Sequence, residues 1–88
     1  MTRDELVARC WQTEGELDRA RERVERATRW LDRTPDGSPD KPDAELRVQR
    51  ALRVYHDAER VAGDAADALI AYDDEHGIDT ITGQPKQT

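Results

Sequence analysis

The feature that most constrains this chain is a pair of heptad patterns, one on each side of a single turn. In the first half, small or apolar residues recur at steps of three and four: Leu6, Cys10, Thr13, Leu17, Ala20, Val24, Ala27 and Leu31. The second half repeats the pattern with Ala44, Val48, Ala51, Tyr55, Ala58, Ala62, Ala65, Leu69 and Tyr72. Such a stripe lies along one side of a helix and favours side-by-side packing with a slight supercoil. The pattern therefore predicts two long helices that share one seam.

The only strong turn signal in the chain lies midway between the two patterns. Folding the chain at residues 36–39 pairs seam residues whose numbers add up to 75, such as Leu31 with Ala44 and Leu6 with Leu69. Residues 34–37, Thr-Pro-Asp-Gly, fit a type I turn with Pro second and Gly fourth. We therefore expect an all-α fold: a long antiparallel two-helix hairpin, coiled-coil-like, with a short extended C-terminal tail.

The ends of the two helices are also marked in the sequence. A hairpin over residues 1–76 is expected, with helices at about 3–33 and 41–76 and a turn at 34–40. Thr2 and Glu5 have the spacing of a capping box, and Gly77 is suited to a left-handed helix cap. Residues 77–88 are polar and contain Pro85, which predicts a C-terminal tail and not a third helix.

Composition bounds the size and setting of this fold. The 88 residues allow one small domain, and only 35% of them are hydrophobic, many of these being alanine. No apolar run approaches a membrane span, and the N-terminus lacks the apolar core of a signal peptide. We expect an intracellular soluble protein, or a component of a particle assembled in the cytoplasm, without membrane partners. The single cysteine, Cys10, is interpreted as a small buried hydrophobe.

Charge is distributed unevenly along the chain. The net charge of −6 argues against a generic affinity for nucleic acid phosphates. Residues 19–54 carry ten basic and seven acidic groups, whereas residues 55–88 carry two basic and eight acidic ones. The hairpin should therefore have a mildly basic end at the turn and an acidic end at the termini.

Each end offers one candidate site. Four arginines recur at helical spacing around Trp30 and form a basic stripe: Arg19, Arg23, Arg26 and Arg33. This stripe is the best candidate for a nucleic-acid site, because arginine binds phosphate and an aromatic ring stacks on bases. At the acidic end, three carboxylates lie at a helix C-terminus: Asp73, Asp74 and Glu75. The helix dipole disfavours negative charge at this position. These acids are a candidate docking surface for a basic partner, and the alternative is a solvated surface.

Apolar residues outside the seam form the third candidate. The apolar stripe of the second helix is wider than the first helix can cover, and two-helix units usually need another layer. The residues that we expect to be covered by a second copy or by another protein are Trp11, Trp30, Val54, Val61, Ile78 and Ile81. Trp30 should also lie near Arg47 across the hairpin, where stacking is possible.

Catalytic and metal-binding patterns are not evident in the sequence. His56 and His76 would lie about 30 Å apart along one helix, and there is no Gly-rich phosphate loop or Ser-His-acid set. We therefore expect a non-enzymatic protein without a cofactor or metal. The leading hypothesis is a protein–protein interaction or assembly subunit, for example of a virion-like particle, that self-associates or docks on a partner. The alternative is a small regulator or inhibitor acting on nucleic acid or on a nucleic-acid enzyme.

Overall fold

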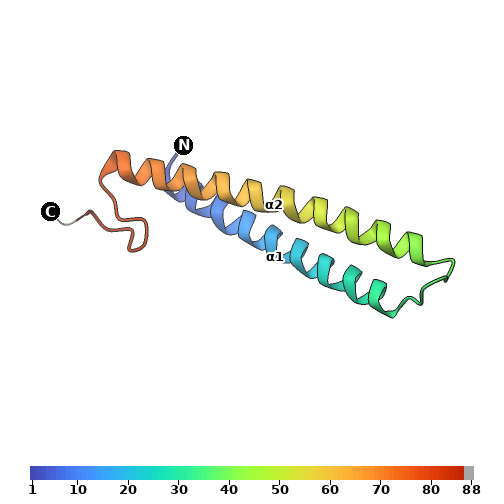
Figure 1. Cartoon of the computed structure of the whole chain (residues 1–88). Helices are drawn as coiled ribbons and strands as arrows, with labels where there is room; N and C mark the ends of the chain where they lie inside the picture. Colours follow the sequence, from blue (N-terminus) through green and yellow to red (C-terminus); the bar gives the residue numbers. More distant parts are fainter. Residues whose placement is uncertain (87–88) are drawn as a thin grey trace.

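The computed structural model describes residues 1–86 and shows two long antiparallel helices joined by a short turn (Figure 1). Helix α1 spans Arg3–Arg33 and helix α2 spans Lys41–His76, which are the ranges expected from the sequence. The molecule measures 64 × 19 × 17 Å, and the first residue and the last described residues both lie at the end opposite the turn (Figure 1). The predicted all-α hairpin is confirmed. Within residues 1–86, neither helix carries an apolar stretch long enough to cross a membrane.

The helix ends are closed as their capping residues predict. The Thr2 hydroxyl accepts a hydrogen bond from the Glu5 amide at 3.3 Å, which satisfies one of the free amides at the start of α1. Gly77 adopts a left-handed conformation with φ +67°, and its amide donates to the carbonyls of Asp73 and Asp74. The Ile78 amide also donates to the Asp73 carbonyl, at 2.8 Å, so the end of α2 is a well-formed glycine cap.

The helices are joined by residues 34–40, as expected, but the β-turn within this segment lies one residue later than expected. The Ser38 amide donates to the Pro35 carbonyl at 3.1 Å, so the turn comprises residues 35–38 and the expected type I turn at 34–37 is wrong. Gly37 is the third residue of this turn, with φ +82°, and a type II turn needs a glycine there because φ is positive. Thr34 instead ends α1: its hydroxyl donates to the Trp30 carbonyl at 2.8 Å.

Three contacts fix the register of the two helices. The Arg3 guanidinium meets the Asp73 carboxylate at 2.8 Å, and the Cys10 thiol donates to the Ala65 carbonyl at 3.3 Å. Nearer the turn, Arg47 lies over the ring of Trp30 at 4.4 Å. All three pairs lie within two residues of the predicted pairing, so the predicted register is confirmed along the length of the hairpin.

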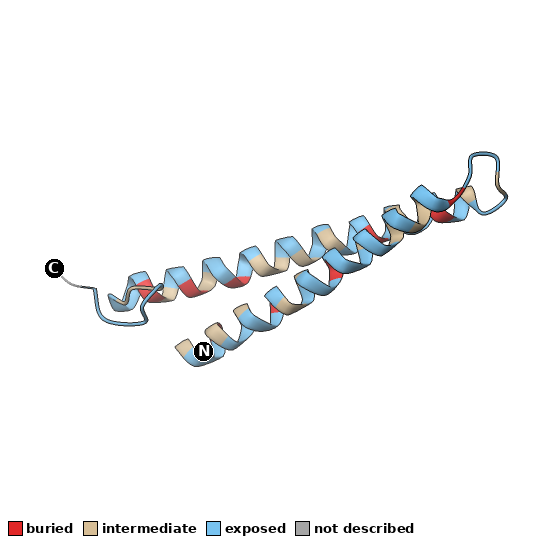
Figure 2. Ribbon diagram, turned by 90° about the horizontal axis from the view of Figure 1, so that it is seen from below, coloured by how far each residue is buried: buried red, intermediate tan, exposed pale blue. Residues whose placement is uncertain are grey.

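The core is a narrow line of small residues on the facing sides of the helices (Figure 2). Its buried hydrophobic members are Leu6, Ala20, Ala44, Ala51, Ala65 and Leu69. Thr13 is buried among them, and its hydroxyl donates to the Cys10 carbonyl at 3.0 Å. The rest of each helix surface is largely exposed, because two helices have only one contact face each.

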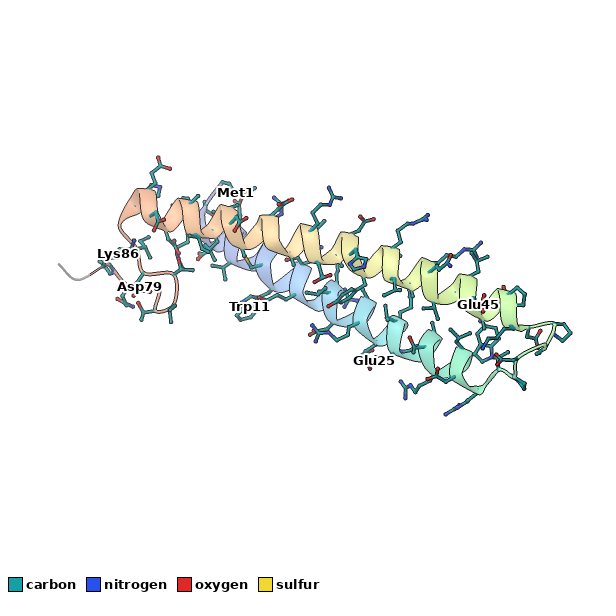
Figure 3. All side chains as sticks on the ribbon, in the orientation of Figure 1. Met1, Trp11, Glu25, Glu45, Asp79 and Lys86 are labelled. Carbon is teal, nitrogen blue, oxygen red and sulfur yellow. The ribbon has the colours of Figure 1, made fainter. Side chains whose placement is uncertain are left out.

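The segment after α2 is non-helical, as predicted, and its described part closes into a loop against the end of the hairpin. The Asp79 amide donates to the Gln84 carbonyl and the Lys86 amide donates to the Gly77 carbonyl, both at 2.8 Å. Asp79 and Lys86 therefore lie together in this loop (Figure 3). Residues 87–88 of the predicted tail lie outside the described residues.

Candidate functional site

An exposed groove runs between α1 and α2 from the middle of the hairpin toward the turn, and we call it the arginine groove. It consists of two adjoining parts, of about 360 and 390 Å³, that share Arg23 and Val54. The apolar residues that line it are Ala20, Ala27, Trp30, Ala51, Val54, Ala58 and Val61. The charged residues that line it are Glu16, Arg19, Arg23, Arg26, Arg47, Arg50 and Asp57. The groove thus combines small apolar side chains with guanidinium groups.

Helical spacing explains why these residue types meet. On α1, Arg19, Arg23 and Arg26 recur at steps of four and three beside the alanines of the seam, so one flank of the helix is basic. On α2, Val54 and Val61 lie one heptad apart on the flank that faces the same groove. Because the seam residues between the flanks are mostly alanine, the two helices leave a hollow where larger side chains would fill it.

The guanidinium groups of the groove differ in their partners. Arg26 pairs with Glu22 at 3.6 Å and Arg47 pairs with Asp43 at 3.5 Å, each one turn along its own helix. Within residues 1–86, Arg19, Arg23 and Arg50 form no ion pair. These three arginines can therefore bind an acidic group without first losing a partner in their own chain.

Trp30 closes the turn end of the groove. The guanidinium of Arg47 lies 4.4 Å from the ring centroid, which confirms the predicted stacking across the hairpin. On its other side Trp30 lines a further hollow, of about 380 Å³, with Arg26, Arg29 and Arg33. The predicted basic stripe is thus divided by the structure: Arg19, Arg23 and Arg26 line the arginine groove, whereas Arg33 lies beyond Trp30.

The six expected interface residues do not form one surface. Trp30, Val54 and Val61 line the arginine groove. Trp11 and Ile81 line a separate hollow of about 410 Å³ near the chain ends, and their side chains are 75% and 94% exposed. Trp11 projects away from α1 (Figure 3). Ile78 is half-buried in the terminal loop, where it forms an antiparallel bridge with Pro85.

The acidic cluster also separates into different environments, because Asp73 is fully buried. Its carboxylate accepts hydrogen bonds from Arg3 Nε at 2.8 Å and from Arg3 Nη2 at 3.2 Å. Asp74 is exposed and pairs with Lys86 at 2.9 Å, while Glu75 is exposed. The expectation of three adjacent docking carboxylates therefore does not hold for Asp73, whose charge is already satisfied inside the molecule.

The pKa of Asp73 reflects this pairing. The hydrogen bond from Arg3 is the main cause that holds the pKa of the carboxyl below its ordinary value of 3.8, and a hydrogen bond from Thr80 acts in the same direction. The same bond raises the pKa of Arg3. Sequence reasoning missed this ion pair, although Asp73 follows Leu69 by four residues and Arg3 precedes Leu6 by three. Both residues therefore extend the seam by one step.

Within residues 1–86, no group of three or more histidine, cysteine, aspartate or glutamate side chains is placed to hold a metal ion. Comparisons of the chain with protein-family models, with curated proteins and with solved structures found no match.

Proposed function

We propose that this protein is a non-enzymatic helical-hairpin subunit that binds another protein molecule through the arginine groove. The observation that carries the proposal is the coexistence of exposed apolar side chains and unpaired guanidinium groups in one groove. Val54, at the centre of the groove, is 44% exposed. Arg23 and Arg50 lie beside it without ion pairs inside residues 1–86.

The energetics of both components favour a protein partner. Covering apolar surface contributes about 25 cal/mol per Å² to the free energy of binding. Alanine and valine side chains make this contribution only where a partner contacts them closely enough to exclude water. Guanidinium groups form bidentate hydrogen bonds with carboxylates and are enriched with aromatic residues at protein interfaces. A third or fourth helix packed along the groove would complete the layer that the hairpin lacks.

A site-specific photo-cross-linker placed at position 54 tests this proposal in the cells that make the protein. Val54 lines the groove, so a benzophenone side chain there should give covalent adducts with a protein partner. The matched control is Leu52, which is 37% exposed and does not line the groove. Adducts from position 54 and not from position 52 support the proposal, and the absence of adducts from position 54 overturns it.

A second candidate function is regulation of nucleic acid or of a nucleic-acid enzyme. It is favoured by one observation, the gathering of Arg26, Arg29 and Arg33 around Trp30. The net charge of −6 opposes it, since long-range attraction to phosphates is lacking. The mass in solution at physiological salt, with and without duplex DNA, distinguishes the two: a DNA-dependent complex lost on changing Arg29 and Arg33 to Gln supports this second function.

A further inference from the structure

We propose that the occupant of the arginine groove is a second copy of this chain, packed antiparallel to the first about a two-fold axis near Asp57. This inference rests on the proposed function, because it names the partner of the same groove. It predicts a dimer in which α1 and α2 of each copy form a four-helix arrangement with those of the other.

The charge of the groove changes sign along its length. The turn end is lined by Arg23, Arg26, Arg47 and Arg50, whereas carboxylates enter only toward the other end, at Glu16 and Asp57. Asp64 follows one turn beyond Val61 on the same helix flank and forms no ion pair within residues 1–86. The groove, together with the flank of α2 that continues it, therefore has a basic half at the turn end and a mixed half in which Glu16, Asp57 and Asp64 accompany Arg19.

Antiparallel packing of two copies matches these halves. An axis near Asp57 brings Val54 of one copy opposite Val61 of the other, since these residues lie almost equally far from it along α2. Arg50 and Asp64 lie seven residues on either side of Asp57, about 10 Å at 1.5 Å per residue, so each meets the other across the interface. A parallel arrangement would instead place arginine against arginine, which like-charge repulsion opposes.

The middle of the groove suits the same arrangement. Arg19 and Asp57 both line this part and form no ion pair with each other, although Asp57 pairs weakly with Arg60 at 3.7 Å. Near a two-fold axis, Arg19 of each copy lies close to Asp57 of the other, so this contact forms twice. The apolar residues between them, Ala20, Ala58 and Val61, are small enough for helices to approach closely and interdigitate.

The test uses the purified full chain and light scattering over a range of concentrations. One copy has a mass of 10.0 kDa, and a mass of twice this value at high concentration is expected. Arg50→Glu or Asp64→Arg alone should weaken the dimer at least about tenfold by placing like charges together, whereas the double variant should restore it. Leu52→Gln should leave it unchanged. Circular dichroism checks that each variant keeps its helices.

Three results overturn the inference. A wild-type monomer at several hundred micromolar excludes the second copy; if position 54 then cross-links to a different protein in cells, the proposed function stands without this inference. A dimer that is indifferent to Arg50→Glu and Asp64→Arg excludes the antiparallel pairing. If DNA or a different protein binds the monomer and not the dimer, the arginine groove has that molecule, and not a second copy, as its occupant.

Discussion

The terminal half and the turn half of this hairpin use the same two helices, but they bury different side chains. Near the chain ends the buried residues include large or charged ones, namely Leu6, Leu69 and Asp73. Near the turn they are only alanine and threonine: Ala20, Ala44, Ala51 and Thr34. The larger seam residues of the turn half stay half-buried: Val24, Leu31, Val48 and Tyr55.

The difference follows from the number of layers at each end. In the terminal half the loop at 77–86 lies against the helices, and Thr80 and Ile81 line the same hollow as Leu69. In the turn half nothing within residues 1–86 lies over the helix pair beyond the turn itself, and the arginine groove stays open. Two helices alone bury a line of small side chains, and burial of larger ones needs a third element.

The largest expected effect contrasts a leucine from each half. Leu69→Ala removes a buried side chain beside the terminal loop and should lower the free energy of unfolding by about 2–3 kcal/mol. Leu31→Ala removes a half-buried side chain and should cost roughly half as much. Urea unfolding followed by circular dichroism at low protein concentration measures both. Equal costs would show that the two halves are packed alike.

A second contrast concerns the buried charge. The pKa of Asp73 is lowered in the folded state, so its ion pair stabilises the fold above the ordinary pKa of 3.8 and this stabilisation is lost as pH falls through the lowered value. Asp73→Asn should destabilise the protein at pH 7 and remove this acid-dependent loss. Asp74→Asn, which changes an exposed carboxylate, should have a much smaller effect. Denaturant midpoints from pH 7 to pH 2 test this, and curves of the same shape for wild type and Asp73→Asn would contradict it.

Two glycines of α2 should respond in opposite directions. A Cβ added at Gly63 meets no atom within 4 Å, so Gly63→Ala should raise the stability by roughly 0.5–1 kcal/mol through helix propensity. Gly77 has φ +67°, and Gly77→Ala should lower the stability because a side chain strains that conformation. Thermal unfolding distinguishes the two. A destabilising Gly63→Ala would mean that a neighbouring molecule packs against that side of α2.

The smallest expected effect lies in the terminal loop. The hydrogen bond with Asp74 raises the pKa of Lys86 above its ordinary value of 10.5. The Lys86–Asp74 ion pair therefore stabilises the loop below pH 10.5, and this stabilisation is lost as pH rises through the raised pKa. Lys86→Met should loosen the loop without changing the global unfolding midpoint, because both partners are exposed. Amide hydrogen exchange of Lys86, whose amide donates to Gly77, reports this change. Unaltered exchange would mean that backbone contacts alone hold the loop.

Most of the helical architecture could be predicted from the sequence because it depends on local signals. The heptad steps, the capping residues Thr2 and Gly77 and the single turn segment define two helices and their pairing. The β-turn was placed one residue early because Pro35 and Gly37 fit two turns: a type I turn at 34–37 with Pro second and Gly fourth, and a type II turn at 35–38 with Gly third and φ positive.

The candidate sites were predicted less completely because they depend on side-chain directions across the hairpin. Trp11 and Trp30 were grouped because both lie outside the seam of the same helix, but the structure places them in different hollows. Likewise, the run Asp73-Asp74-Glu75 was treated as one cluster, although only Asp73 continues the seam, four residues after Leu69. Its partner Arg3 is seventy residues away in the sequence.

The bond between Arg3 and Asp73 also decides among alternative alignments of the helices. A heptad pattern tolerates sliding by seven residues, since seam residues of one helix would again face seam residues of the other. Such a slip would bring Asp73 to the level of Cys10, whose thiol carries no positive charge, and would leave a carboxylate buried without a counter-ion. A single polar pair in an apolar seam penalises misaligned forms in this way. The ion pair thus favours one alignment of the helices, so that a seam built largely of small, interchangeable residues specifies one structure.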